Sequence, residues 1–288
     1  MQYLAPTTCA DAVAALDACD GDARLLAGGT DLLVRLQADM IEPDLLVDIK
    51  RIAECQNITE SDAGFTIGAA VPGAEMTEHA SLSKVWPGIV EGMDLIGSTQ
   101  VQGRATLAGN LCNASPAADS VPAMVAAGTV ANVVGPNGTR QVAVEDIPTG
   151  PGQNSLGKDE MIASFSLPAR PPRSADAYLR FIPRTEMDIA VVGAAVNLTL
   201  DADGTCSAAR VVIGAVGPRI MIVDAAAQAL IGSKVDATAL QAVQDACSAA
   251  ATPISDKRGT AEFRKHTVGV MARRAAAIAL SRVLLQQA

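Results

Sequence analysis

The fold is decided by the eight residues Leu25-Leu26-Ala27-Gly28-Gly29-Thr30-Asp31-Leu32. The run 24–27 predicts a buried strand, the two glycines predict a turn, and Thr30 is placed to cap a helix that carries Leu36 and Met40. Successive backbone N–H groups between a strand and a helix can hold a diphosphate. A Gly-Gly turn is more often only a turn, however, and the stretch lacks the G-x-G-x-x-G of an ordinary Rossmann site.

The flanking sequence predicts that this turn belongs to a small βαβ-type unit in the first sixty residues. Thr8-Cys9-Ala10-Asp11 has the form of a capping box, so a short helix is expected to start there. Residues 44–49 are a further β-like run, and the alternation at 65–69 is typical of a half-buried strand.

The middle of the chain combines a helical pattern, a long loop and a hairpin. Residues 82–96 have helical periodicity. Residues 99–119 are rich in Gly, Asn, Ser and Pro, which predicts a long ordered loop of the kind that is often functional. Residues 129–134 and 139–144 flank Gly135-Pro136-Asn137-Gly138, where Asn-Gly is expected to supply the positive φ of a hairpin turn.

The pattern changes after the proline-rich stretch 168–172, which is the preferred domain boundary. Residues 189–200 and 209–216 are expected to form two antiparallel strands. Three alanine-rich helical segments follow, the last from about Ala261. The C-terminal third is therefore expected to be a sheet layered with helices.

Composition excludes several classes of protein. The chain has 288 residues and 49% hydrophobic residues, so it can bury a large core and is not disordered. No apolar stretch is long enough to span a bilayer. The formal net charge of −9 argues against nucleic acid and anionic membrane surfaces as partners. The first residues have no signal-peptide pattern, which predicts a cytoplasmic protein.

Metal sites and aromatic stacking platforms are not expected on this chain. The six cysteines are scattered without a C-x-x-C pair, and only two histidines could join them in a zinc or iron–sulfur site. The aromatic residues are one Trp, two Tyr and four Phe. A large planar ligand would therefore have to be held by aliphatic side chains and backbone.

A second candidate binding segment, residues 106–119, is made largely of small residues. Its hydroxyls, amides and the carboxylate of Asp119 can together bind a phosphate, ribose hydroxyls and a ribityl chain, although a long surface loop is the alternative. Residues 152–159 approach a phosphate-binding loop but have Asp159 where a magnesium-binding hydroxyl is needed, so we interpret them as a connecting loop. No hydrolase triad or nucleophile elbow is present.

Together the two segments resemble those of the FAD-binding medium subunit of the molybdenum hydroxylases, the xanthine dehydrogenase and carbon monoxide dehydrogenase family. Residues 25–32 are similar to the family's A-G-G-T/H-x-L segment, and residues 100–119 to its Q-I-R-N-x-G-T-I-G-G-N…A-S-P-x-x-D signature. Residues 178–190 resemble its Y-x-K-x…R-x-x-x-D-I-A stretch, and residues 253–264 its P-x-x-D-x-R-G-S-A-x-Y-R segment. The four matches occur in order along the whole chain.

The resemblance implies an α+β fold in two domains. A two-lobed FAD-binding domain of the vanillyl-alcohol-oxidase (PCMH) type would occupy 1–170, with lobes of about 1–57 and 58–170. A C-terminal domain of the carbon monoxide dehydrogenase flavoprotein type would occupy 174–288. Ala108 replaces a family glycine, which requires that its φ be negative.

The resemblance also implies which residues hold FAD. Residues 25–32 would wrap the diphosphate, Asp119 would hold ribose hydroxyls, and Arg180 would stabilise the reduced flavin. Cys112 could form a covalent flavin bond, although an ordinary thiol is favoured. The full set is Leu25, Leu26, Ala27, Gly28, Gly29, Thr30, Asp31, Leu32, Ile96, Thr106, Gly109, Asn110, Asp119, Ile162 and Arg180.

The implied function is electron transfer within a heterotrimer or a dimer of heterotrimers. A large subunit would carry the molybdenum cofactor, and a small subunit two [2Fe–2S] clusters that pass electrons to the FAD of this chain and on to an external acceptor. No residue here is expected to act as general base. The alternatives are a self-contained flavin oxidoreductase on the same fold and an assembly subunit without cofactor.

Overall fold

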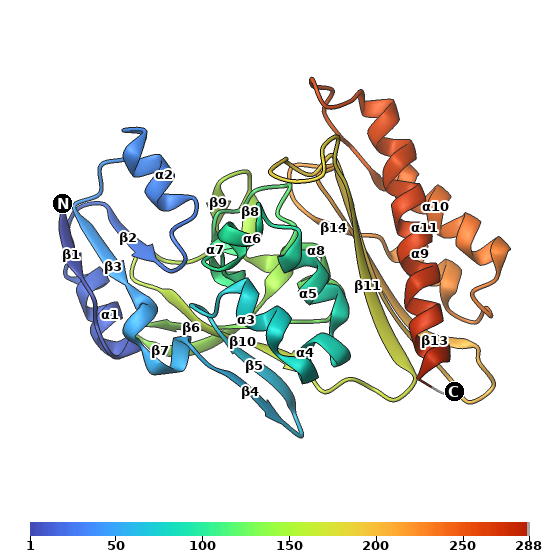
Figure 1. Cartoon of the computed structure of the whole chain (residues 1–288), viewed down its shortest axis with the longest axis horizontal. Coiled ribbons are helices and arrows are strands. Elements are labelled where there is room, and N and C mark those ends of the chain that lie inside the picture. Colours follow the sequence, from blue (N-terminus) through green and yellow to red (C-terminus); the bar gives the residue numbers. More distant parts are fainter. Residues whose placement is uncertain (287–288) are drawn as a thin grey trace.

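The computed structural model describes residues 1–286, which form helices and sheets in two adjoining parts (Figure 1). The N-terminal part begins with a parallel sheet of β1 (Gln2–Leu4), β2 (Ala23–Leu26) and β3 (Leu45–Asp48), in the order β1-β3-β2. Helix α1 (Cys9–Asp17) starts after Thr8, whose hydroxyl accepts a hydrogen bond from the Asp11 N–H at 3.1 Å. The expected helix start at Thr8 and the βαβ unit are therefore confirmed.

Helix α2 (Leu32–Gln37) follows the glycine turn but differs from the expected helix. Asp31 rather than Thr30 occupies the N-cap position, and its side chain makes no capping hydrogen bond. The helix ends before Met40, because Asp39 has a φ of 53°, a left-handed conformation that terminates helices. The prediction of a Thr30-capped helix that reaches Met40 was wrong.

An antiparallel sheet of five strands forms the centre of the N-terminal part, in the order β4-β5-β10-β6-β7. Its strands are β4 (Ile58–Ser61), β5 (Gly64–Gly68), β6 (Val130–Gly135), β7 (Gly138–Ala143) and β10 (Met161–Pro168). The β6–β7 hairpin is confirmed, but Gly138, with a φ of 103°, takes the positive φ and Asn137 does not. A two-stranded sheet of β8 (Pro148–Gly150) and β9 (Gln153–Asn154) precedes β10.

Short helices connect β5 to β6. They are α3 (Gly73–Glu78), α4 (Ala80–Val85), α5 (Pro87–Asp94), α6 (Thr99–Gln102), α7 (Leu107–Cys112) and α8 (Ser120–Ala126). The helix expected at 82–96 is broken at Trp86, because Pro87 lacks an N–H and starts α5 instead. The loop expected at 99–119 is partly helical, since Thr106 caps α7 by accepting the Gly109 N–H at 3.0 Å. Single 3₁₀ turns lie at Ile49–Arg51, Ala53–Cys55 and Val144–Asp146.

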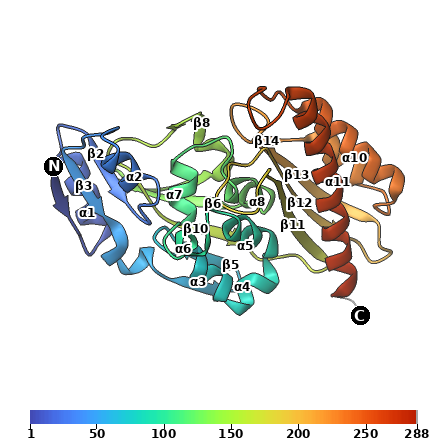
Figure 2. The same ribbon diagram turned by 45° about the horizontal axis from the view of Figure 1, so that its top comes forward.

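The C-terminal part is an antiparallel sheet of β11 (Ser174–Phe181), β12 (Val192–Leu200), β13 (Cys206–Gly214) and β14 (Met221–Ile222). Helices α9 (Asp224–Leu230) and α11 (Ala261–Leu285) cover one face, and α10 (Ala237–Ala250) packs against both of them. Helices α5 and α8 contact the other face (Figures 1 and 2). The expected strand pair and three helices are confirmed. Within residues 1–286, none of these helices combines the length and apolarity needed to cross a membrane.

Buried polar contacts join the two parts. Asp176 on β11 accepts a hydrogen bond from the Gly88 N–H at the start of α5 (3.1 Å) and pairs with Arg170 at 2.6 Å. Glu91 on α5 accepts the Tyr178 N–H at 2.9 Å. These hydrogen bonds and the ion pair tie α5 and Arg170 to β11 across the boundary between the two parts.

Candidate functional site

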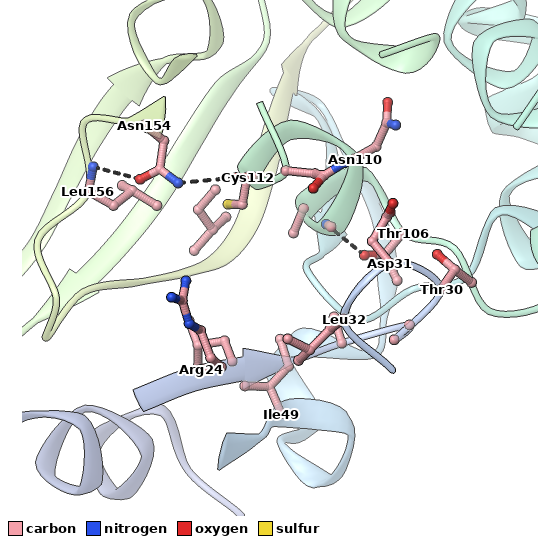
Figure 3. Close-up of a pocket in the computed structure, with 18 of the residues that line it drawn as sticks. Arg24, Thr30, Asp31, Leu32, Ile49, Thr106, Asn110, Cys112, Asn154 and Leu156 are labelled. Carbon is pink, nitrogen blue, oxygen red and sulfur yellow. Dashed lines mark hydrogen bonds between the residues drawn. The ribbon is translucent and has the colours of Figure 1, made fainter. Parts of the chain in front are cut away.

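A cavity of about 320 Å³ lies between the parallel sheet and α7 (Figure 3). Its walls come from three segments that are far apart in the sequence: β2 with its glycine turn, the start of α7, and the segment from β9 to β10. Ile49, Ile96, Leu156 and Ile162 supply apolar surface, and among the described residues that line the cavity none is aromatic. A planar ligand here would contact aliphatic groups and backbone.

The glycine turn lies directly against the residues that precede α7. A Cβ atom added to Gly28 would lie 1.9 Å from the carbonyl oxygen of Arg104 and 3.2 Å from Cα of Ala105. Gly29 has a φ of 77°, which residues with a side chain rarely adopt. The two glycines therefore allow the two candidate segments to meet at one cavity.

The glycine turn also presents backbone N–H groups that have no acceptor. Across residues 1–286, the N–H groups of 28–32 donate no hydrogen bond to the protein, whereas the next, that of Leu33, bonds to the Gly29 oxygen at 3.0 Å. Residues 28–32 all line the cavity. Adjacent unpaired N–H groups of this kind suit the oxygen atoms of a phosphate.

The start of α7 forms the facing wall. Thr106 uses its hydroxyl oxygen to cap the helix, which leaves its O–H free to donate into the cavity. Asn110 accepts hydrogen bonds from the Ser120 N–H (3.2 Å) and hydroxyl (2.7 Å), so its amide nitrogen still has two N–H donors. Ala108 does not have a positive φ, so the extra methyl group is compatible with the backbone.

Twelve of the fifteen residues expected to hold the cofactor line this cavity. They are Leu25, Ala27, Gly28, Gly29, Thr30, Asp31, Leu32, Ile96, Thr106, Gly109, Asn110 and Ile162. Leu26, Asp119 and Arg180 lie outside its lining. Leu26, the last residue of β2, is buried.

Asp119 and Arg180 form a buried pair behind the cavity wall. One carboxylate oxygen of Asp119 accepts a hydrogen bond from the Tyr178 hydroxyl (3.0 Å), and the other pairs with Arg180 at 2.8 Å. Arg180 also donates to the Leu95 oxygen at 2.6 Å, next to Ile96 of the cavity. Burial raises the pKa of Asp119 to about 6, although Arg180 and Tyr178 act in the opposite direction. Its ribose contact stays a prediction.

Sequence reasoning missed the third wall, residues 154–160, which it interpreted as only a connecting loop. Asn154, Leu156, Gly157, Lys158 and Glu160 line the cavity. The near match of residues 152–159 to a phosphate-binding loop could have pointed to a binding role for this segment. No apolar strand leads into it, which is why a connecting loop was favoured. Arg24 and Arg35 were also missed, because only the fold brings these cations to the cavity.

Cys112 lines the cavity but is not poised to react. Burial raises the pKa of its thiol to about 12, so the thiol is neutral at physiological pH. Its backbone oxygen accepts a hydrogen bond from the Asn154 amide at 3.1 Å. As for metals, residues 1–286 contain no cluster of three or more His, Cys, Asp or Glu that could bind an ion.

Comparison with known families identifies both parts of the chain. Residues 1–170 match the family described as the FAD-binding domain in molybdopterin dehydrogenase. Residues 177–279 match the carbon monoxide dehydrogenase flavoprotein C-terminal domain.

Individual relatives are similar over nearly the whole chain. The xanthine dehydrogenase FAD-binding subunit of Escherichia coli O157:H7 is 30% identical over 94% of this chain and 93% of that protein. The carbon monoxide dehydrogenase medium chain of Afipia carboxidovorans is 32% identical over 95% of this chain and 94% of that protein. Among solved structures, a chain of Cu,Mo-CO dehydrogenase has a TM-score of 0.92 at 32% identity, covering 98% of both chains.

Proposed function

We propose a function from the premise that this chain belongs to the family of FAD-binding subunits of the molybdenum hydroxylases. It is an oxidoreductase subunit that carries FAD and transfers electrons. The observation that carries the proposal is the meeting of the Gly28-Gly29 turn with the start of α7 around one cavity.

The residues present fit FAD. The unpaired N–H groups of 28–32 suit its diphosphate, and Gly28 allows the backbone to approach without a Cβ. Thr106 and Asn110 offer donors for the ribityl hydroxyls. The aliphatic side chains of Ile96 and Ile162 give flat apolar contacts for rings. We assign Leu26, Asp119 and Arg180 to the support of these walls, and the contacts of Asp119 with ribose hydroxyls and of Arg180 with reduced flavin stay predictions.

The domain limits belong to the same proposal. We assign residues 1–170 to FAD binding, as lobes of about 1–57 and 58–170, and residues 174–288 to the C-terminal domain. Two hydrophobic cores support this division, as does the connection 169–173 between β10 and β11. The second core lies wholly in the C-terminal part, and the first also takes in Tyr178, Ala195, Val212 and Ile220 where the two parts pack together.

The chain's own residues bind, orient and shield the cofactor. When bound, FAD supplies the redox chemistry that links iron–sulfur donors to an external acceptor. The buried Arg180–Asp119 pair fixes the segment that carries Ile96. No residue is assigned as general base, since the organic substrate would react on another subunit.

We assign this chain two partners, a small subunit with [2Fe–2S] clusters and a large subunit with the molybdenum cofactor. The match to the chain called the medium chain of carbon monoxide dehydrogenase supports this assembly. The complex is placed in the cytoplasm, where the six free thiols would stay reduced.

The test is to purify the chain with whatever accompanies it and to record the visible spectrum and the metal content. A flavin spectrum, FAD released on denaturation, and co-purified iron and molybdenum would support the proposal. A flavin without iron or molybdenum would favour a self-contained oxidoreductase. A colourless chain that takes up no FAD would overturn the flavin assignment.

A further inference from the structure

A second cavity, of about 600 Å³, lies where the N-terminal and C-terminal parts meet. Its walls come from β4 and β5, from α4, from the connection 169–173 and from the C-terminal end of α11. These elements lie on the side of the molecule away from α2 and the glycine turn (Figure 1). Among residues 1–286, none lines both this cavity and the cofactor cavity. The second cavity is therefore separate from the proposed flavin site.

Basic side chains outnumber acidic ones in the wall of the second cavity. Within the described residues, four cations and one acid line it: Lys84, Arg170, Arg173, Arg282 and Glu60. Asp176 pairs with Arg170 at 2.6 Å, and Glu91 pairs with Arg282. Neither Lys84 nor Arg173 forms an ion pair within residues 1–286. Two cations of the wall thus lack a counter-charge, on a chain whose net charge is −9.

Buried N–H donors at this cavity also lack acceptors. The Nε–H groups of Arg170 and Arg173 are buried and form no hydrogen bond within residues 1–286. The Arg170 side chain is only 7% exposed, and its Cζ atom lies 3.7 Å from the centre of the Trp86 ring, whose Nε1–H is unpaired as well. Burial and the charge of Arg282 lower the pKa of Arg170, against the effect of Asp176. Because buried donors are normally hydrogen-bonded, these groups indicate an acceptor from outside the chain.

Arg173 also has a backbone conformation that is unfavourable for arginine. Its φ is 58°, in the left-handed region that favours glycine. Its backbone oxygen accepts a hydrogen bond from the Leu200 N–H at 2.9 Å, which ties this conformation to the sheet of the C-terminal part. Strained residues of this kind are frequent in binding sites, where the surrounding structure holds them in place.

The remainder of the wall is mostly apolar. Its apolar side chains include those of Val85, Pro87, Pro171, Pro172 and Leu285. A cavity of this size, with apolar walls and a few polar groups, is typical of sites for small molecules. Arginine binds phosphate and carboxylate groups through charge-assisted hydrogen bonds. A ligand that suits the whole wall therefore has an oxyanion and an apolar body.

We propose that the second cavity binds a small organic oxyanion, a phosphate or carboxylate with an apolar body, and that Arg173 and Lys84 supply the charge that holds it. The apolar body lies against the prolines of the connection 169–173 and the end of α11. Because the wall comes from both parts of the chain, the bound anion links them. The site does not depend on FAD, so this inference goes beyond the proposed function.

The test is isothermal titration of the full chain, with its flavin bound, by four small probes. Phenyl phosphate and benzoate distinguish the two kinds of oxyanion, inorganic phosphate supplies the oxyanion alone, and benzylamine carries the opposite charge on a similar apolar body. At least one of the two aryl anions is expected to bind, and inorganic phosphate to bind about tenfold more weakly, because it buries no apolar surface. Benzylamine is expected not to bind, since the cations repel it.

Variants of the two cations assign the site. Arg173→Gly is expected to bind the aryl anion at least about tenfold more weakly, since a hydrogen bond to a charged group is lost. It is expected to melt no lower than the unsubstituted chain, because glycine suits a φ of 58°. Lys84→Gln should weaken binding about threefold, as Lys84 is exposed. The matched control is Lys265→Gln, which removes an exposed lysine at the opposite end of α11 and is expected to change nothing.

The opposite results would overturn the proposal. These are full affinity in Arg173→Gly, equal losses in Lys84→Gln and Lys265→Gln, binding of benzylamine as tight as that of the aryl anions, or no binding of either aryl anion at millimolar concentration. If Arg173→Gly does not fold, the comparison of Lys84→Gln with Lys265→Gln decides. Flavin content is expected to be equal in all variants, so the outcome is independent of the flavin assignment.

Discussion

Replacing Gly28 by alanine tests whether the contact between the two segments is needed for FAD binding. The added Cβ would lie 1.9 Å from the Arg104 carbonyl oxygen, where real Cβ atoms do not approach within 3.0 Å. The two segments must therefore separate by about 1.1 Å (3.0 − 1.9). Because the obstacle is backbone, a change of side-chain rotamer does not relieve the clash.

The expected cost follows from this displacement. Overpacking a closely packed site typically costs about 1–3 kcal/mol. If that cost falls on the FAD-bound arrangement, the dissociation constant of FAD rises about 5- to 150-fold, since about 1.4 kcal/mol corresponds to a factor of ten. We expect Gly28→Ala to purify with little flavin and to bind added FAD weakly.

The assay is the flavin content of the purified chain together with a titration by FAD. Gly204→Ala is the matched control, because Gly204 has a φ of 84° and nothing within 4 Å of an added Cβ. That control is expected to lose about 1–2 kcal/mol of unfolding free energy from backbone strain and to keep its FAD affinity. Full flavin content in Gly28→Ala would refute the steric reasoning.

Three further predictions concern Asp119, Thr106 and Cys112. The pKa of Asp119 is raised to about 6 in the folded chain from its usual 3.8, so its contribution to the unfolding free energy is fully present below pH 4 and is lost as the pH rises through 6. In Asp119→Asn, the unfolding free energy should fall less between pH 4 and pH 6, by up to about 3 kcal/mol, as measured by urea denaturation at several pH values. The same pH dependence of the unfolding free energy in the variant and the unsubstituted chain would contradict this. Thr106→Val removes the cap of α7 and should lower the unfolding free energy by about 1 kcal/mol, while Thr106→Ser should restore it; equal stability of both variants would argue against the cap. Because the Cys112 thiol is neutral, acid precipitation should release all of the flavin, and a pellet that stays yellow would indicate a covalent bond.

Local sequence signals were sufficient for elements whose start is encoded by a few adjacent residues. The capping box at Thr8 and the turn before Gly138 gave α1 and the β6–β7 hairpin correctly. Pro87 should have divided the helix expected at 82–96, since a proline favours the first position of a helix over its interior. Helix α2 failed for another reason: its apolar periodicity predicts burial, but none of its side chains is buried.

The site was predictable to the extent that it depends on local backbone. The glycine turn and the start of α7 could be identified because their glycines and small residues let two backbone segments approach each other closely. The partners of Asp119 could not be identified, since Tyr178 and Arg180 are 59 and 61 residues away in the sequence. The third wall likewise depends on the bond from Asn154 to Cys112, which spans 42 residues.

The net charge of −9 raises the question of how such a chain could hold an anionic diphosphate. Coulombic repulsion from exposed surface charges is screened over a distance of about 10 Å, so the groups that line the cavity decide the local potential. Glu160 is paired with Arg140, and Asp31, whose pKa is raised by partial burial, lies beside Arg35, which acts on that pKa in the opposite direction. Arg35, Lys158 and the unpaired N–H groups of 28–32 are positive groups along the cavity that can face a diphosphate. Neutralising Lys158 should therefore weaken FAD binding more than neutralising an exposed lysine elsewhere, and the difference should shrink as salt is added.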